Sequence, residues 1–278
     1  MAQLYPILEY DPDPAAVYSP QHHIVRSAEV PECCVLCFFH DVFASLRESG
    51  AAVPVAALGS ELGPNPVYRI MVGGRAVALV HPGVGAPLAA FFLEELIALG
   101  CTTFIVCGGA GVLDREIAVG HLIVPTAAIR DEGTSYHYLP PGREVAPDGA
   151  ALAAIERTLT ARGVPYHRAK TWTTDGLYRE TPDKVRRRRE EGCATVEMEA
   201  AALFAVAQFR GVPLAQILYG GDDVSGLGDW DHRGWDRQGT VREELVWLAA
   251  EAALEVAGNP PQRVGKPEVG SDEQEANG

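Results

Sequence analysis

The sequence has no excess of basic residues. Its 23 Lys and Arg stand against 37 Asp and Glu in 278 residues, which gives a formal charge of −14 at pH 7 and a pI near 5.0. Since proteins that bind polyanions concentrate Lys and Arg on one face, we expect no nucleic-acid partner. Long apolar runs and a basic, apolar leader are also missing. We therefore expect a soluble, cytoplasmic protein with no membrane partner.

The six cysteines show no disulfide framework. They lie mostly in apolar runs, such as Cys33–Phe39 and Ile105–Cys107, which is typical of reduced core residues in a reducing compartment. Cys34, Cys37 and His40 have the spacing of metal ligands, but a metal site needs a fourth ligand and an exposed loop. We expect no metal site.

The chain also lacks an internal repeat and a linker rich in Pro, Gly or Ser, so we expect a single domain. Strand-like runs alternate with helical patterns, which predicts an α/β fold with a central, largely parallel or mixed β-sheet flanked by helices. The expected strands are 77–80, 103–107, 122–125 and 214–219, and the expected helices are 87–99, 148–162 and 240–257. The last helix opens with Thr240 and Glu243 at the spacing of a capping box.

The strongest chemical signal is the run Glu197, Met198 and Glu199 at the start of an apolar stretch with helical spacing. The plain alternative is that the two acids merely favour a helix N-terminus. A strand-like run then leads into Asp222 and Asp223. Because acidic residues just past a buried strand lie where open α/β sheets bind ligands, these acids together predict a ligand site.

Four consecutive arginines, Arg186 to Arg189, have the composition of a phosphate clamp. Glu190 and Glu191 follow them, so that Arg186 with Glu190 and Arg187 with Glu191 have helix-pair spacing. We interpret the run as a solvated helix surface held by such pairs.

The chain contains, in order, the segments Val80–Gly85, Glu94–Leu96 with Leu99–Gly100, Gly108–Gly111, Val119–Pro125, and Val196–Ala201 followed by Asp222. These resemble segments of the nucleoside phosphorylase family that includes uridine phosphorylase and bacterial purine nucleoside phosphorylase. The resemblance implies a core domain over residues 65–257 and an N-terminal segment, 1–64, that packs on it. The remainder, 258–278, is rich in Gly, Pro, Glu, Asn and Ser, and we expect a disordered tail.

The resemblance implies a role for each acid. Glu199 stands where the family accepts hydrogen bonds from both ribose hydroxyls, and Met198 stands where a side chain packs under the sugar. Glu197 would lie toward the base. Asp222 matches the aspartate that protonates or hydrogen-bonds purine N7 as the base leaves. Asp223 takes that role if the turn carries one extra residue.

The same resemblance implies that Leu177 and Tyr178 stack on the base and that Gly109 also lines the substrate. Backbone amides of Gly85, Gly108 and Gly109 would hold phosphate, since glycine-rich loops expose N–H groups to anions. No cofactor is implied, only a nucleoside and phosphate as co-substrates. The family also implies a homo-oligomer built from dimers, as large as a hexamer.

Two features depart from the family. The Gln and Arg with which uridine phosphorylases read uracil are not found in residues 179–183. The two phosphate-binding arginines have only Tyr10–Pro14 and Val106 as their nearest counterparts. The candidates to replace their charge are an arginine of a neighbouring subunit, Arg26, Arg69 and Arg130.

Three functions stay open. The first is a nucleoside phosphorylase, a pentosyltransferase that releases free base and ribose 1-phosphate. The second is a nucleoside hydrolase, an N-glycosidase that uses water, because burying a phosphate dianion without a paired cation is costly. The third is a nucleoside-binding protein without turnover. The retained acid candidates disfavour this third function, since binding alone needs no acid for the leaving group.

Overall fold

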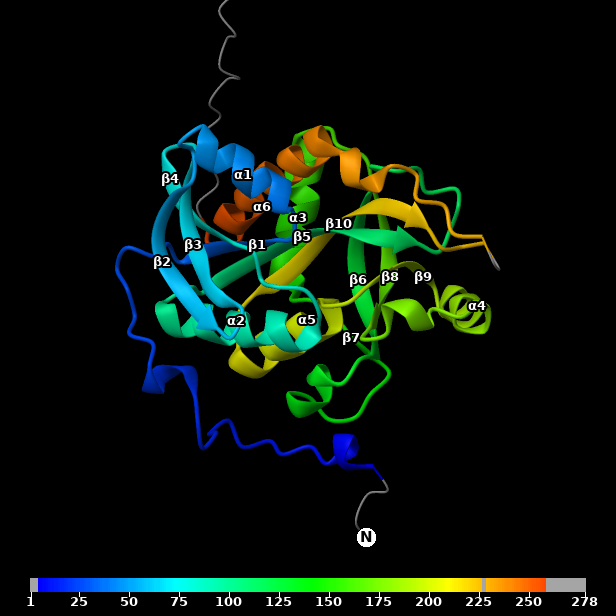
Figure 1. Ribbon diagram of the computed structural model, residues 1–278, viewed down its shortest axis with the longest axis horizontal. Coiled ribbons are helices and arrows are strands. Elements are labelled where there is room, and N and C mark those ends of the chain that lie inside the picture. The colour runs from blue at the N-terminus through cyan, green and yellow to red at the C-terminus, as the bar shows by residue number, and fades with distance from the viewer. Residues whose placement is uncertain (1–4, 227–228, 259–278) are drawn as a thin grey trace, which may run out of the picture.

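The computed structural model describes residues 5–226 and 229–258. Within these ranges the chain forms a mixed sheet of ten strands and six α-helices (Figure 1). The strands are β1 (Cys33–Cys37), β2 (Val53–Ser60), β3 (Gly63–Val72), β4 (Arg75–Val80), β5 (Thr103–Val112), β6 (Leu122–Asp131), β7 (Glu144–Val145), β8 (Tyr166–Thr174), β9 (Cys193–Glu197) and β10 (Leu214–Asp223). The helices are α1 (His40–Glu48), α2 (Ala86–Leu99), α3 (Gly149–Ala161), α4 (Pro182–Glu190), α5 (Ala200–Arg210) and α6 (Gly239–Val256), and two of the 3₁₀ turns are η4 (Leu177–Arg179) and η5 (Trp235–Arg237).

Five of the strands are hydrogen-bonded to one another in a closed circuit. β5 pairs with β10 and with β9, β10 pairs with β6, and β6–β8 and β8–β9 pairing completes the circuit. From β5 the sheet continues as an open ladder through β1, β4, β3 and β2. The prediction of an α/β domain with a mixed sheet and flanking helices is confirmed. The closure brings the ends of β5, β8, β9 and β10 together, and this proximity is not visible in the sequence.

Helices cover both faces of the sheet (Figure 1). α1, α3 and α6 pack over one core, which includes Val35 and Tyr219. α2 and α5 pack over the other, which includes Phe104 and Phe204. α4 lies to the side, against β9. The strand ends between these layers are therefore the part of the sheet that is left for a ligand.

The limits of α2 follow the sequence pattern closely. Gly85 has a φ of 90° and precedes the helix, Pro87 lies in its first turn, and Gly100 ends it with a φ of 118°. The capping box expected for α6 is wrong. That helix begins at Gly239, and its N-cap Gln238 makes no side-chain capping hydrogen bond.

The expected loop over Gly108–Gly111 is wrong, because β5 runs through it to Val112. Glycine is needed there for packing rather than for a turn. A Cβ atom on Gly108 would lie 3.1 Å from the Phe38 ring, and one on Gly109 would lie 3.1 Å from the Tyr219 ring. These strand residues are therefore not an amide-rich anion loop.

The expectation that both acids of the 197–199 run open a helix is also corrected. β9 ends at Glu197, and α5 begins only at Ala200, with Glu199 as its N-cap. The β-branched residues before Glu197 pair with both β5 and β8, which holds this part of the run extended. Glu197 and Glu199 thus lie on either side of a strand-to-helix connection.

The N-terminal part of the chain contributes to the sheet itself. β1 lies between β4 and β5, and β2 pairs with β3 across the expected division after residue 64. The described residues before β1 run along the outside of the molecule (Figure 1), where His23 Nε2 lies 2.9 Å from Glu95 Oε1. The expected tail lies outside the described residues, apart from Gly258.

All six cysteines are free and buried. Cys34 and Cys37 face opposite cores because they lie three residues apart on β1, so these two thiols do not converge on one ion. Burial raises the pKa of Cys34 and Cys107 well above the ordinary value. No His, Cys, Asp and Glu group in the described part of the chain is placed to hold a metal ion. Over the same residues, every helix is too short or too polar to cross a membrane.

Candidate active site

Glu197 is a fully hydrogen-bonded anchor at the end of β9. Its Oε2 accepts the backbone N–H of Glu199 (2.8 Å) and of Ala200 (2.6 Å), and its Oε1 accepts the Thr173 hydroxyl (2.6 Å). Thr173 Oγ1 in turn accepts the N–H of Ala201 (2.9 Å). The first amides of α5 are thereby satisfied. Burial raises the pKa of Glu197 even though these hydrogen bonds oppose the shift. Thr173 begins the segment whose Leu177 and Tyr178 resemble the family's base-stacking residues, but nothing in the sequence indicated that its hydroxyl holds Glu197.

Glu199 joins two parts of the chain that lie 114 residues apart. The Gly85 N–H donates to Glu199 Oε1 (2.6 Å), and the Met198 N–H donates to its Oε2 (3.2 Å). Burial, together with the charge of Glu197, raises the pKa of Glu199 to about 8. A buried carboxylate that receives two amides and no cation is suited to further neutral donors, such as a pair of ribose hydroxyls. Met198 lies half-buried next to it.

The surroundings of Glu199 are acidic. Asp175, directly after β8, accepts the Gly133 N–H (2.9 Å) and adds to the upward shift of the Glu199 pKa. Glu132 is buried nearby, and its own pKa is raised by burial and by Asp175. Where these carboxyls are ionised, their negative charge favours a ligand that becomes positively charged, as a ribose ring does when its glycosidic bond breaks.

Asp222 lies at the end of β10, close to the end of β9. Its Oδ2 accepts the indole N–H of Trp230 (2.7 Å). A Cβ atom on Gly111 would lie 3.6 Å from Asp222 Oδ1 and 3.1 Å from Val196, the residue before Glu197. The closed circuit of strands therefore brings this aspartate to the same edge as the two glutamates.

Asp223 is engaged in structural contacts. Its Oδ1 accepts the Ser225 N–H (2.8 Å), and its Oδ2 lies 3.6 Å from Arg115 Nε. Burial alone would raise the pKa of Asp223, but Ser225, Arg115 and Arg233 hold it below the ordinary value. A carboxylate stabilised in its ionised form is a poor proton donor, so the geometry favours Asp222 over Asp223 as the acid.

A cavity of about 270 Å³ lies beside Asp222. Its lining residues are Leu177, Tyr178, Glu180, Pro182, Val185, Val224, Gly226, Asp229 and Trp230. Leu177 and Tyr178 line it and are exposed, by 52% and 94% of their surface. The sequence interpretation missed Glu180 and Trp230. The sequence offered one signal for Trp230, which is its position as an aromatic residue between Asp229 and Asp231 after a strand.

The loop Gly83–Gly85 carries no cation in this structure. The Gly83 N–H donates to His81 Nδ1 (3.1 Å), and burial lowers the pKa of His81 with a further contribution from His40. The Phe38 ring lies edge-on to His81, with 5.9 Å between ring centroids, and covers Gly108. The expected phosphate side is therefore lined by an aromatic ring and a neutral imidazole.

Two of the arginines considered as replacements lie elsewhere. Arg26 donates to Glu32 (3.0 Å) and packs against Gly100, at the far end of α2 from Gly85. Arg130 is buried and donates to the Ser135 hydroxyl and to two backbone carbonyls. Neither guanidinium reaches the glycine loop.

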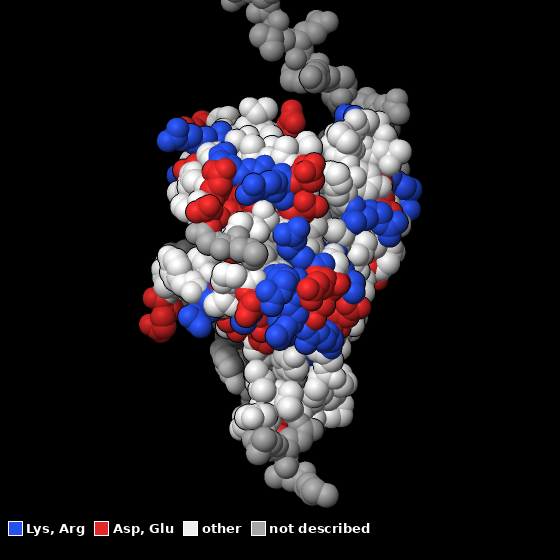
Figure 2. Space-filling model, turned by 90° about the vertical axis from the view of Figure 1, so that its right-hand side faces the viewer, with Lys and Arg blue, Asp and Glu red and all other residues white. Residues whose placement is uncertain are grey.

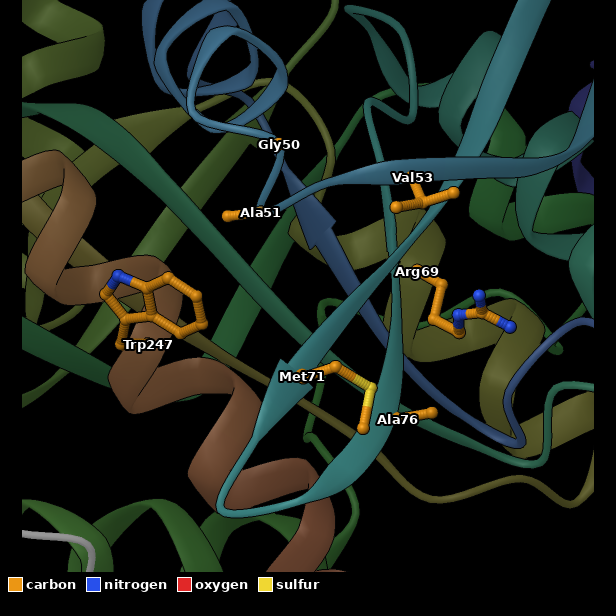
Figure 3. A pocket seen from close by; sticks show the side chains of 7 residues that line it. All are labelled: Gly50, Ala51, Val53, Arg69, Met71, Ala76 and Trp247. Carbon is orange, nitrogen blue, oxygen red and sulfur yellow. The ribbon is translucent and has the colours of Figure 1, made fainter.

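Arg69 lines a separate surface hollow of about 490 Å³. Figure 3 shows its side chain on β3 near Val53 and Met71, with Trp247 on the neighbouring α6. In the sheet Arg69 is paired with Ala78, so it lies before the end of β4 rather than at the loop that follows it. It does not supply the missing charge within this chain.

The segment Tyr10–Pro14 also lies away from the site. The Pro14 carbonyl accepts a hydrogen bond from Arg210 (3.3 Å), which is the last residue of α5. Glu199 is at the opposite end of that helix. The residues that follow the first strand at the relevant edge are instead Phe38 and Phe39.

The arginine run lies on α4, where basic and acidic side chains are intermixed on the surface (Figure 2). The ion pairs differ from those expected. Arg186 pairs with Asp183 (2.9 Å), and Glu191 pairs with Arg143 and Arg188. Arg188 is buried rather than solvated, because it also binds Asp131 (3.2 Å) and lies over the Trp172 ring.

Comparisons of sequence and structure agree with one another. The family model for the phosphorylase superfamily matches residues 32–257. A guanosine phosphorylase of Halorubrum lacusprofundi is 32% identical over 156 residues, 55% of this chain and 65% of that protein. The solved uridine phosphorylase of Vibrio fischeri is 26% identical, with a TM-score of 0.68 over 86% of this chain and 97% of its own. A solved AMP nucleosidase of Bacteroides thetaiotaomicron is 26% identical, with a TM-score of 0.62 over 81% and 87%.

The chain spans just under two thirds of the length of the curated guanosine phosphorylase, 65%. The family model, in contrast, covers most of the described chain, from β1 to the end of α6. The resemblance to nucleoside phosphorylases that the sequence motifs indicated is confirmed by this match and by the names of the relatives. The chain therefore belongs to the phosphorylase superfamily.

Proposed function

We propose that this protein cleaves the N-glycosidic bond of a nucleoside with phosphate, releasing the free base and ribose 1-phosphate. The observation that carries the proposal is the contact between the buried Glu199 and the Gly85 N–H at the start of α2. It joins a ribose-binding carboxylate to a helix N-terminus, which is a favourable place for an anion.

Each reacting charge has a residue that suits it. In its ionised form Glu199 accepts hydrogen bonds from the ribose hydroxyls, and its charge stabilises the oxocarbenium character that develops on the sugar. Because the pKa of Glu199 is raised to about 8, the share of this form increases as pH rises toward 8. Glu197 acts through its neighbour, because it fixes the backbone of Glu199 and Ala200. Asp222 donates a proton or a hydrogen bond to the departing base. Leu177 and Tyr178 cover the base, and Met198 packs beneath the sugar.

Phosphate would bind next to Gly85 at the first turn of α2, whose amides have no intrahelical partner, while the Gly85 N–H itself stays with Glu199. The relatives named guanosine phosphorylase and uridine phosphorylase support phosphorolysis. The missing arginine charge would come from a neighbouring subunit. Gly108 and Gly109 would not bind phosphate through their amides and would contribute only their close packing on Phe38 and Tyr219. Phosphate affinity is then expected to be weak in isolated subunits.

A specific observation favours hydrolysis as the second candidate. Phe38 and His81 line the expected phosphate side, Val106 is fully buried in β5, and an apolar surround disfavours a dianion more than it disfavours water. A solved neighbour with this fold is a nucleosidase. A nucleoside-binding protein without turnover remains the third candidate, and the placement of Asp222 beside the cavity argues against it.

The test is a panel of nucleosides incubated with the purified protein in phosphate buffer and in carefully phosphate-free buffer, with products separated by chromatography. Phosphorolysis is expected to require phosphate, to saturate with it and to yield ribose 1-phosphate. Equal rates without phosphate, with free ribose as product, would establish the hydrolase. Binding of nucleosides without any product would leave only the binding protein.

A further inference from the structure

Arg242, near the start of α6, is a buried cation that the proposed site does not use. Its side chain is 9% exposed. The guanidinium lies over three aromatic rings, at 5.4 Å from the ring centroid of Phe39, 5.9 Å from that of Tyr219 and 5.4 Å from that of Trp235. A buried guanidinium is costly to desolvate, so its place in the fold depends on the groups that it binds.

The hydrogen bonds of Arg242 converge on η5. Its Nε donates to the Tyr219 hydroxyl (3.0 Å), and its Nη2 donates to the backbone carbonyl of Trp235 (3.4 Å). The Tyr219 hydroxyl donates to the same carbonyl (2.9 Å). Its carboxylate partner, Asp41 of α1, accepts from Nη1 (2.9 Å) but is 46% exposed, so water screens this ion pair. The stronger reason for the burial is therefore the attachment of η5 to β10 and α6.

The segment that contains η5 also reaches Asp222. In residues 229–238, which we call the η5 segment, the indole N–H of Trp230 donates to Asp222 Oδ2 (2.7 Å). The His232 ring contacts both tryptophans, with 5.4 Å between its centroid and that of Trp230 and 6.1 Å between its centroid and that of Trp235. These rings form a continuous row between Asp222 and the buried guanidinium.

Two further contacts hold the η5 segment, and both act on its backbone or beside it. The backbone of Asp231 pairs with that of Asp223 (2.8 and 3.1 Å), and Arg233 donates to the Ile117 carbonyl (2.8 Å). The Trp230 ring itself is 62% exposed. A largely exposed ring keeps one orientation only where its neighbours limit its rotamers, so the row of rings from η5 is needed to hold it.

We propose that Arg242 is a positioning residue for Asp222. It fixes η5, so that the Trp230 indole stays on one carboxyl oxygen of Asp222 and the other oxygen is left for the departing base. A carboxyl held in this way keeps within the narrow range of geometries that proton transfer needs. The inference rests on the proposed function, because it takes Asp222 as the group that faces the base.

The first test is fluorine NMR on the full chain labelled with fluorotryptophan, with no ligand added. The chain contains four tryptophans, and Trp230→Phe identifies the Trp230 resonance by its loss. Asp222→Ala then shows where this resonance lies when the indole has no carboxylate acceptor. Arg242→Met keeps the stem of the side chain and removes its donors, while the Tyr219 hydroxyl keeps the Trp235 carbonyl as a partner. In Arg242→Met the Trp230 resonance should move at least halfway to its position in Asp222→Ala.

Three comparisons make this shift decisive. The Trp235 resonance is the internal control, because its ring contacts Arg242 and it should move in any folded Arg242 variant. Arg162→Met removes an arginine that pairs with Glu251 on the same helix, and it should leave the Trp230 resonance in place. Arg242→Lys keeps the charge without the planar fork and should give a smaller shift, which also tests the inference if Arg242→Met does not fold. A Trp230 resonance that stays in place while that of Trp235 moves would overturn the inference.

The second test is steady-state kinetics on a nucleoside that the native chain cleaves. Arg242→Met should lower kcat about tenfold and change KM by less than about threefold, because a displaced acid matters mainly as the base departs. In a Trp230→Phe background it should have no further effect, since both substitutions act on one row of contacts.

The two tests separate this inference from the proposed function. Equal losses of kcat with and without Trp230 would mean that Arg242 only supports the fold, which would overturn the inference and leave the proposed function standing. If the Trp230 resonance responds as expected and no nucleoside is cleaved, with or without phosphate, the proposed function fails and the positioning of Trp230 by Arg242 stands.

Discussion

Glu199 is the residue on which activity is expected to depend most. Glu199→Gln keeps an acceptor oxygen for the Gly85 N–H but cannot carry the negative charge that the proposed function directs at the sugar. We expect kcat/KM to fall by a factor that corresponds to about 2 to 4 kcal/mol of transition-state stabilisation. Steady-state kinetics on the best nucleoside, with circular dichroism to show a native fold, measure this. Near-normal kinetics in a folded variant would remove Glu199 from the site.

The same substitution should stabilise the protein at alkaline pH. Glu199 has a pKa raised to about 8 in the folded chain, so folding favours its protonated form. Its contribution to stability is complete below the ordinary carboxyl pKa and is lost as pH rises through about 8. Glu199→Gln should therefore melt higher than the native chain near pH 9, by roughly 2 to 4 °C per kcal/mol recovered, and the difference should shrink toward pH 4. A constant difference across this range would contradict the shift.

The two neighbouring aspartates should separate function from structure. Asp222→Asn is expected to lower kcat about 100-fold or more with a small change in KM, because the proton is needed mainly as a purine base departs. Asp223→Asn should instead lower the melting temperature at neutral pH, since the hydrogen bonds from Ser225 favour the ionised carboxylate. This loss should fade on acidification, where the native Asp223 is protonated too. The reverse pattern of kinetic effects would make Asp223 the acid.

At the scale of an element, the proposed function requires the N-terminus of α2 to position both the sugar and the nucleophile. Gly85→Ala places a side chain at a φ of 90° and should shift the N–H that holds Glu199. We expect a stability loss of about 1 to 3 kcal/mol together with a clear loss of kcat/KM. Gly50→Ala is the matched control, because its φ is 74°, nothing lies within 4 Å of the added carbon, and it follows α1. Equal activity loss in both variants would mean that strain alone was responsible.

At the scale of the whole molecule, exposed apolar side chains lie in the turn before β3, near the end of β3 and in the loop before α2. Leu62, Met71 and Val84 are exposed by 81%, 54% and 66%. Such side chains are typical of a surface that another copy covers, so we expect a homo-oligomer. Light scattering should show a multiple of the 29.7 kDa chain. Leu62→Glu should shift this mass downward, whereas Val17→Glu, in the N-terminal segment, should not. A fully active native monomer would refute the expectation.

The class of the fold follows from the sequence alone, and so do the candidate residues for its chemistry. Periodicity located α2, α3, α5 and α6 to within a few residues, because apolar stripes at helical spacing must be buried whatever the topology. The pattern also singled out Glu199 and Asp222, since acidic residues next to buried apolar elements are costly unless they bind something. These inferences depend on local chemistry, which the sequence carries in full.

How these residues meet depends on the tertiary structure. The closure of β5, β10, β6, β8 and β9 into a circuit brings Asp222 beside the end of β9, and this results from pairing between distant strands. It also turned Glu197 into an anchor for backbone amides, extended β5 through its glycines and placed Glu180 in the cavity. Local sequence propensity does not predict these arrangements, because each is determined by contacts between segments far apart in the chain.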